Sequence, residues 1–197
     1  GCPSRGDDAV EMLRTLAALA RVDGRVAVFL EPIALYMAKD LYEPGDGQWL
    51  FPYPEQGRAM PLGEGRVYGE GNDDLVIFTY GNGVPMSLRA ARRIEAERGW
   101  KVRVVDLRWL VPLNQDFIAA QARSARRVLV VDEGRRSAGV GEGVLAAIVE
   151  AGFGGEHGGR PFARVAGADT YTPLAGAAFL VIPAEDDIFA AAMNLGS

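Results

Sequence analysis

Leu75-Val76-Ile77-Phe78-Thr79 is the first of three apolar runs that end in a polar turn and lead into a helical stretch. The other two are Val102-Arg103-Val104-Val105-Asp106 and Val128-Leu129-Val130-Val131-Asp132. Short buried strands that alternate with helices are typical of a parallel α/β sheet. Because such sheets hold their ligands at the carboxyl ends of the strands, the residues after these runs are the first candidates for a functional site.

Apolar periodicity extends this pattern in both directions. Upstream, it predicts a helix over residues 7–20, capped by Asp7 or Asp8, and a strand over residues 26–30. Within the α/β repeat, helices are expected through Leu88, from Asn114 and through Val144. Downstream, we expect a strand at 162–166, a short helix within 173–180 and a final helix over 184–195.

A segment rich in glycine, proline and aromatic residues divides the chain. A long connection without regular structure must lie along a surface. We therefore expect three parts: residues 1–40 as the end of one α/β domain, residues 41–74 as a linker, and residues 75–197 as a second α/β domain.

The composition is that of an ordinary globular chain: 197 residues, 49% hydrophobic, 24% charged and a formal net charge of -5. No apolar run approaches the ~20 residues that cross a bilayer, and the first residues lack the features of a signal peptide. We expect a cytoplasmic protein that does not associate with membranes. Cys2 is the only cysteine, near an end that we expect to be frayed, which excludes an internal disulfide or a cysteine metal cluster.

The charge is unevenly distributed. Residues 84–136 contain twelve Lys or Arg against six Asp or Glu. This excess is compatible with a face for an acidic partner or nucleic acid, but stacking aromatic residues are not interleaved with it. We favour solvated helix faces whose arginines reach nearby acids, and we expect no nucleic-acid binding.

Two glycine-rich turns follow strands and invite comparison with dinucleotide-binding loops. Gly81-Asn82-Gly83 has Met86 where a third glycine is required, and Gly139-Val140-Gly141-Glu142-Gly143 has Val144. Glu142 would also repel phosphate. We interpret both as structural turns.

The titratable residues near the strand ends form no recognisable catalytic set. Asp132 and Glu133 are adjacent and point to opposite faces of a strand, so an ion pair with Arg108, Arg135 or Arg136 is expected rather than acid/base chemistry. His157, the single histidine, lies in a glycine-rich loop without a serine or cysteine nucleophile beside it, and we expect it to be solvated.

Several motifs occur together in a fixed order. They are Phe29-Leu30-Glu31-Pro32 with Leu35-Tyr36, Thr79-Tyr80-Gly81, Asp106-Leu107-Arg108-Trp109-Leu110-Val111-Pro112-Leu113-Asn114, Arg127-Val128-Leu129-Val130-Val131-Asp132-Glu133, Gly139-Val140-Gly141 and Arg164-Val165-Ala166-Gly167-Ala168-Asp169. This set resembles the C-terminal domain of the transketolase group, and within it the beta chain of thiamine-diphosphate-dependent 2-oxoacid dehydrogenases of the pyruvate or branched-chain type.

The resemblance implies an α/β fold: a three-layer, mostly parallel mixed sheet of about five strands between helices, after a remnant of a pyrimidine-binding domain. The intact enzyme would decarboxylate a 2-oxoacid with thiamine diphosphate and magnesium and pass the acyl group to a lipoyl acyltransferase. By this resemblance, the residues that activate the cofactor would belong to regions before Gly1 or to the partner half. We therefore expect no catalytic, cofactor-binding or metal residue here, and assign Arg108, Pro112, Asp132, Glu133 and Arg136 to an interface or to structure.

Two departures from the family pattern limit what carries over. The potassium site of the family is matched by Asp23, but Arg25 stands where a neutral residue is usual. The acidic residue that docks the acyltransferase is replaced within Gly158-Gly159-Arg160-Pro161. Both the potassium site and docking by the usual charge pair are therefore in question.

The leading hypothesis is a C-terminal assembly domain of such a dehydrogenase, inactive alone, with a separate alpha chain or fused N-terminal domains as partner. We also expect it to be a homo-oligomer. The alternatives are the same domain of a transketolase or a deoxyxylulose-phosphate synthase, and a nucleotide- or nucleic-acid-binding module.

Overall fold

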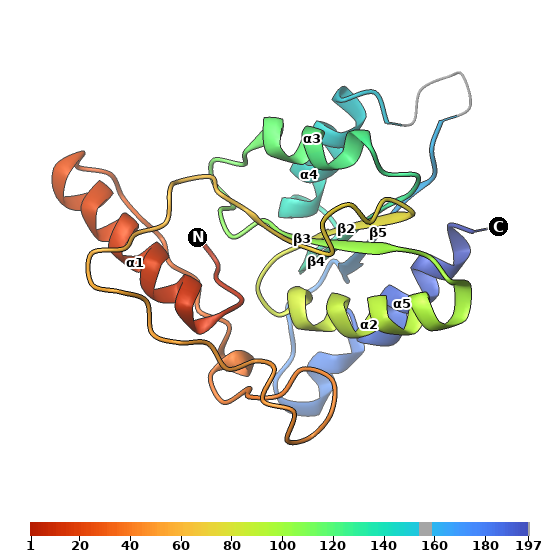
Figure 1. Cartoon of the computed structure of the whole chain (residues 1–197), viewed down its shortest axis with the longest axis horizontal. Coiled ribbons are helices and arrows are strands. Elements are labelled where there is room, and N and C mark those ends of the chain that lie inside the picture. Colours follow the sequence, from red (N-terminus) through yellow and green to blue (C-terminus); the bar gives the residue numbers. More distant parts are fainter. Residues whose placement is uncertain (154–158, 197) are drawn as a thin grey trace.

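The computed structural model describes residues 1–153 and 159–196. Its centre is a five-stranded sheet in the order β1-β3-β2-β4-β5 (Figure 1). The strands are β1 (Arg66–Tyr68), β2 (Leu75–Thr79), β3 (Val102–Asp106), β4 (Val128–Arg135) and β5 (Phe162–Gly167). Strands β2 to β5 pair in parallel and β1 pairs antiparallel with β3, which confirms the mostly parallel mixed sheet of five strands.

Two layers of helices cover the sheet, as Figure 1 shows. α2 (Gly83–Arg98) and α5 (Glu185–Asn194) lie on one face, and α3 (Gln115–Arg123) and α4 (Val140–Glu150) lie on the other. Every residue of β2 and of β3 is buried, because both faces of these central strands are covered. Alternate β2 residues therefore enter different cores: Val76 and Phe78 pack toward α3 and α4, and Leu75 and Ile77 toward α2 and α5.

Local sequence explains where two of the helices begin or end. The side chain of Asn114 accepts a hydrogen bond from the backbone nitrogen of Phe117 at 3.0 Å, so Asn114 caps α3 as expected. Gly99 ends α2 with φ +66°, a left-handed conformation that glycine adopts without steric penalty. The short helix η2 (Ala175–Leu180) and α5 confirm the two helices expected downstream.

The N-terminal part departs from the sequence predictions. α1 (Gly6–Val22) forms beside the sheet, but neither Asp7 nor Asp8 caps it, since Arg5 occupies the cap position without a side-chain bond. Cys2 was expected near a frayed end and is instead buried, with its backbone nitrogen bonded to the carbonyl oxygen of Arg108 at 2.8 Å. The start of the described chain is therefore held against the end of β3.

The strand expected at residues 26–30 does not form. The segment is joined to Gly1 by two hydrogen bonds, from the Gly1 nitrogen to the Val28 oxygen and from the Leu30 nitrogen to the Gly1 oxygen, each 2.9 Å long. Val26 remains 97% exposed. An apolar run does not make a strand without a neighbouring strand to bond its backbone, and none lies beside this segment in the described residues.

Residues 41–65 connect the N-terminal part to β1 along the surface, anchored by a few buried side chains such as Leu41, Trp49 and Met60. A second short helix, η1 (Ile33–Leu35), precedes this connection. β1 was not anticipated because only three residues form it, in a segment dominated by glycine and charge. Across the described residues, no helix has the length and apolar character that crossing a membrane requires.

Candidate functional site

The carboxyl ends of β2, β3 and β4 meet at one edge of the sheet, as parallel strands require. This edge contains Tyr80, Asp106 and Asp132, each immediately after or at the end of a buried apolar run. The aspartates are almost completely inaccessible to solvent. Buried carboxylates are costly unless they are hydrogen-bonded, so their partners show what this edge can do.

Asp132 is fully engaged with protein donors. Its Oδ1 atom accepts the Tyr80 hydroxyl at 2.5 Å and the Gly134 backbone nitrogen at 2.8 Å, and its Oδ2 atom accepts the Gly141 nitrogen at 2.7 Å. Burial, together with the bond to Asp132, raises the pKa of Tyr80, which keeps the phenol protonated as a donor. Asp132 therefore acts as a structural acceptor rather than as a general base.

The same carboxylate explains the second glycine-rich turn. A Cβ atom at Gly139 would come within 2.7 Å of Asp132 Oδ2 and within 2.5 Å of the Arg135 carbonyl oxygen. Asp132 thus occupies the position at the start of α4 where a bound anion would accept backbone N–H groups. This contact supports the interpretation as a structural turn.

The first glycine-rich turn is closed in a similar way. The nitrogens of Gly83 and Val84 donate to the carbonyl oxygens of Tyr80 and Gly81 at 3.1 and 3.2 Å. Pro85 follows and has no N–H group. The first three residues of α2 therefore offer no free N–H group to a phosphate, which supports its interpretation as a structural turn.

Glu133 differs from its neighbour Asp132. It is half-buried and accepts one hydrogen bond, from the side-chain amide of Asn82 at 3.2 Å. Burial raises its pKa, the Asn82 bond opposes that change, and the nearby Asp132 adds to it. Within the part of the chain that the structure describes, Glu133 forms no ion pair.

Asp106 is the most deeply buried carboxyl group at this edge. It accepts the Ser4 hydroxyl and, at 3.1 Å, the Arg108 backbone nitrogen. Burial raises its pKa to about 6, although both the Ser4 bond and the Arg108 charge act in the opposite direction. Asp106 thereby ties the start of the described chain to the end of β3.

The expected ion pairs of Asp132 and Glu133 with arginine are wrong. Arg108 bonds instead to Asp8 of α1, through Nε at 3.0 Å and Nη2 at 2.8 Å, and both side chains are buried. Arg66 reaches the same carboxylate at 2.7 Å. The partner of Arg108 is thus a carboxylate in a helix that is distant in the sequence. The spacing of residues in the sequence does not reveal such a contact.

The remaining predicted residues lie apart from these contacts. Pro112 follows a cis peptide bond after Val111 and lines an apolar groove of about 530 Å³ together with Val26 and Val28. Arg136 bonds through its backbone nitrogen to the Gly167 oxygen at 2.9 Å and exposes its side chain. The structure therefore brings together Asp132 and Glu133 near Tyr80 and Asn82, but it adds neither Pro112 nor Arg136 to them.

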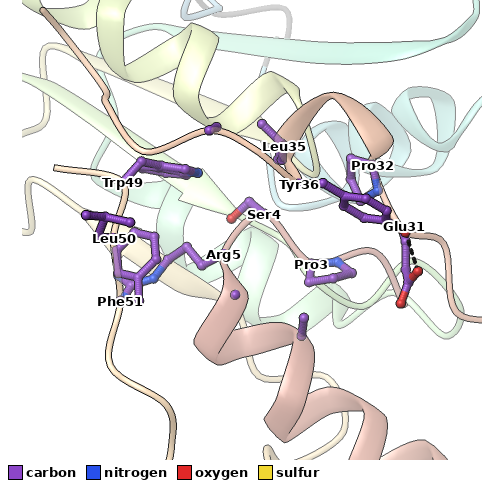
Figure 2. A pocket seen from close by; sticks show the side chains of 13 residues that line it. Pro3, Ser4, Arg5, Glu31, Pro32, Leu35, Tyr36, Trp49, Leu50 and Phe51 are labelled. Carbon is purple, nitrogen blue, oxygen red and sulfur yellow. Dashed lines mark hydrogen bonds between the residues drawn. The ribbon is translucent and has the colours of Figure 1, made fainter. Parts of the chain in front are cut away.

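A cavity of about 540 Å³ lies between the N-terminal segment and the connection to β1. Figure 2 shows Trp49 and Phe51 on one side and Pro32 and Tyr36 on the other. The Arg5 guanidinium lies 3.7 Å from the centre of the Phe51 ring. Sequence reasoning missed this cavity because its walls come from segments without regular periodicity; the aromatic residues of the connection were its only signal.

Among the described residues, six of the twelve basic residues in the segment 84–136 form ion pairs within the chain. Arg89, Arg93, Arg103, Arg108 and Arg126 each form an ion pair with an acid from another element. This confirms the expectation of arginines that reach nearby acids.

Two further predictions concern metal and docking sites. Asp23 pairs with Arg25 at 3.5 Å in an exposed position, and among the described residues no group of acidic, histidine or cysteine side chains could hold a metal ion. Arg160 donates to the carbonyl oxygens of Arg123 and Ala125 at 2.6 and 2.8 Å. His157 lies outside the described residues.

Comparison with known proteins agrees with this architecture. The transketolase C-terminal domain family matches residues 63–184. The beta subunits of the pyruvate dehydrogenase E1 component of Staphylococcus aureus and Staphylococcus epidermidis are 38% and 36% identical to this chain over 135 residues. Each match covers 68% of this chain and 40% of the relative, so the chain spans about 40% of the length of these curated relatives.

A solved structure described as a split-gene transketolase, inactive beta4 tetramer, has the same fold. It superposes with a TM-score of 0.58 at 25% sequence identity and covers 70% of this chain and 43% of the other.

Proposed function

Because the chain belongs to the transketolase C-terminal domain family and is homologous to the beta subunit of pyruvate dehydrogenase E1, we propose that it is the assembly domain of a 2-oxoacid dehydrogenase. The parent enzyme would decarboxylate a 2-oxoacid and transfer the acyl group to lipoyl. This chain would position other parts of the enzyme and would be inactive alone. Residues 1–40, 41–74 and 75–197 would be the end of the preceding domain, the linker and the assembly domain.

The observation that carries this proposal is that the polar groups at the strand ends are hydrogen-bonded to other groups of the same chain. Asp132 takes three protein donors, and the first turn of α2 has no free N–H group. Asp106 is likewise bonded to Ser4 and to the backbone of Arg108. An edge whose polar groups bind one another holds elements in place and offers little to a substrate.

Apolar side chains exposed at the surface support an assembly role. Large exposed apolar patches on a globular domain commonly mark contacts with other protein. The exposed set lies mainly in the N-terminal segment and between β5 and α5, and it includes Val22, Val26, Val28, Ile33, Met37, Tyr171, Leu174, Phe179 and Leu180.

Thiamine diphosphate and magnesium belong, in this proposal, to the intact enzyme. The described residues do not fit that cofactor: they contain no cluster of metal ligands, and the glycine turns that resemble phosphate loops are occupied by protein groups. The cofactor would be held by the remainder of the dehydrogenase. The other proposed partners are the lipoyl acyltransferase and further copies of this chain, and the beta4 tetramer of the related structure favours the latter.

Calorimetric titration of the chain with thiamine diphosphate and magnesium tests the proposal. We expect no binding by the chain alone, and restored binding when the upstream domains are present. Micromolar binding by the isolated chain would contradict the assignment as an inactive assembly domain.

The same domain of a transketolase or a deoxyxylulose-phosphate synthase is the second candidate, favoured by the likeness to the split-gene transketolase. The identity of 38% to the dehydrogenase subunit, against 25% to that structure, favours the dehydrogenase. Activity of the complete enzyme on 2-oxoacids against ketose phosphates separates the two. The nucleotide- or nucleic-acid-binding alternative is less favoured, because half of the basic residues in its segment are paired with acids of the same chain and its glycine turns are bonded internally.

A further inference from the structure

A second cavity, of about 440 Å³, lies where the first turn of α2 approaches the residues that precede α5. Its volume falls in the range of pockets that bind small organic molecules. Trp49 and Leu35, both labelled in Figure 2, line this cavity as well as the one described above. The two cavities are therefore neighbours that share these side chains.

The walls of the second cavity are mainly apolar. Leu35 contributes from the N-terminal part and Trp49 from the connection to β1. Pro85 and Met86 contribute from the first turn of α2, and Ile182 from the chain before α5. A ligand with an apolar body would gain from leaving water here, by an amount that grows with the apolar area it buries.

One half-buried carboxylate in the lining lacks a cation. Glu133 lines the cavity, is half-buried, and receives a single hydrogen bond from Asn82. The Asn82 amide nitrogen must face the carboxylate, because its oxygen would be repelled there. A partly desolvated carboxylate gains strongly from a cationic hydrogen-bond donor.

The other charged groups at the cavity already have partners. The Arg89 Nε atom lies 2.6 Å from Glu185, and both Asp40 oxygens accept backbone N–H groups at 2.8 Å. The first turn of α2 has no free N–H group, since the Gly83 and Val84 nitrogens are bonded. These contacts disfavour an anionic ligand.

From this arrangement we propose that the cavity binds a small organic cation, a primary amine with an apolar body. The ammonium group donates to Glu133, and the body packs against Trp49 and Met86. A divalent metal is a poor alternative, because metal ions of this kind take several oxygen ligands and the described residues offer no such cluster. This site goes beyond the assembly role and does not depend on it.

Benzylamine is the probe, and benzyl alcohol is its neutral control of similar shape. Isothermal titration calorimetry of the chain should give a Kd for benzylamine of about 1 mM or tighter, a modest affinity for a ligand of this size. Benzyl alcohol should bind at least about tenfold more weakly, because it lacks the charge that meets Glu133. Fluorescence of Trp49 should change on addition of benzylamine, and Trp49→Phe should remove that change.

Glu133→Gln should weaken benzylamine binding at least about tenfold and leave binding of benzyl alcohol unchanged. Glu97→Gln is the matched control, since Glu97 is exposed on α2 and does not line the cavity. Thermal unfolding of both variants without ligand establishes that they fold. The proposal is overturned if benzylamine and benzyl alcohol bind equally, if benzylamine does not bind at 10-fold the Kd expected above, or if Glu133→Gln alters only the oligomeric state.

Discussion

Asp106 shows how one residue can set the pH dependence of the domain. Its carboxyl group is completely buried and its pKa is raised to about 6. The unfolded chain has an ordinary aspartate pKa, near 3.9. Folding therefore favours the protonated form: the contribution to stability is fully present below about pH 4 and is lost as the pH rises through 6.

Asp106→Asn should remove this dependence. An amide can still accept from the Arg108 nitrogen and donate to Ser4, without the cost of a buried charge. As pH falls from 7 to 4, the free energy of unfolding of the natural chain should rise by about 2 kcal/mol relative to the variant. Urea denaturation at several pH values measures the difference. Asp116→Asn, at an exposed position, should show no such trend, and a constant difference for Asp106→Asn would contradict the assignment.

A second prediction at this scale concerns the hydroxyl of Tyr80. Tyr80→Phe removes one of three donors to the buried Asp132 carboxylate and should lower the free energy of unfolding by about 1–3 kcal/mol. Tyr53→Phe is the matched control, because Tyr53 is 77% exposed and lies outside the strand ends. Equal effects of the two substitutions would show that the Tyr80 bond contributes little.

At the scale of elements, a buried pair of side chains connects α1 to the sheet. Arg108 at the end of β3 makes two hydrogen bonds to Asp8, which also accepts from Arg66 of β1. Breaking a buried pair by removing one partner leaves an uncompensated charge. The position of α1 therefore depends on an interaction between residues 100 positions apart in the sequence.

Asp8→Ala should lower the free energy of unfolding by about 3–5 kcal/mol. It should also increase amide hydrogen exchange in α1 more than in α2, because α1 loses its link to β3. Asp23→Ala, just after the same helix, removes only an exposed pair and should cost less than about 1 kcal/mol. Unchanged exchange in α1 of Asp8→Ala would contradict this role for the pair.

The difference between local patterns and contacts across the chain explains which features could be predicted from the sequence. Strands β2, β3 and β4 and their helices follow from local apolar patterns, and the Asn114 cap follows from one polar side chain. The prediction of a strand at residues 26–30 was wrong because a strand needs a neighbouring strand to bond its backbone. A local apolar run does not reveal whether such a neighbour exists. The partner of Arg108 and the burial of Cys2 likewise arise from contacts between distant segments.

For the whole molecule, the exposed apolar residues between β5 and α5 suggest how copies associate. Tyr171, Leu174, Phe179 and Leu180 are each more than three-quarters exposed. A stable interface usually buries about 800 Å² on each partner, and such side chains provide its apolar centre. We expect the chain to self-associate through this group.

Sedimentation equilibrium tests self-association directly. The chain should form dimers or larger species at micromolar concentration, and Leu174→Glu should weaken association at least about tenfold. Val149→Glu is the control, because Val149 is half-exposed on α4 and lies outside this group. A monomer at about 100 μM would argue against a homo-oligomer held by this surface.

The Asp132 carboxylate at the start of α4 has a practical consequence for purification and screening. The chain carries its own anion at this helix end, bonded to Gly141 in the way that a phosphate would be. Phosphate or nucleotide in a buffer would have to compete with a group that is covalently attached and never diffuses away. Stabilisation by such additives would therefore have to arise elsewhere on the molecule.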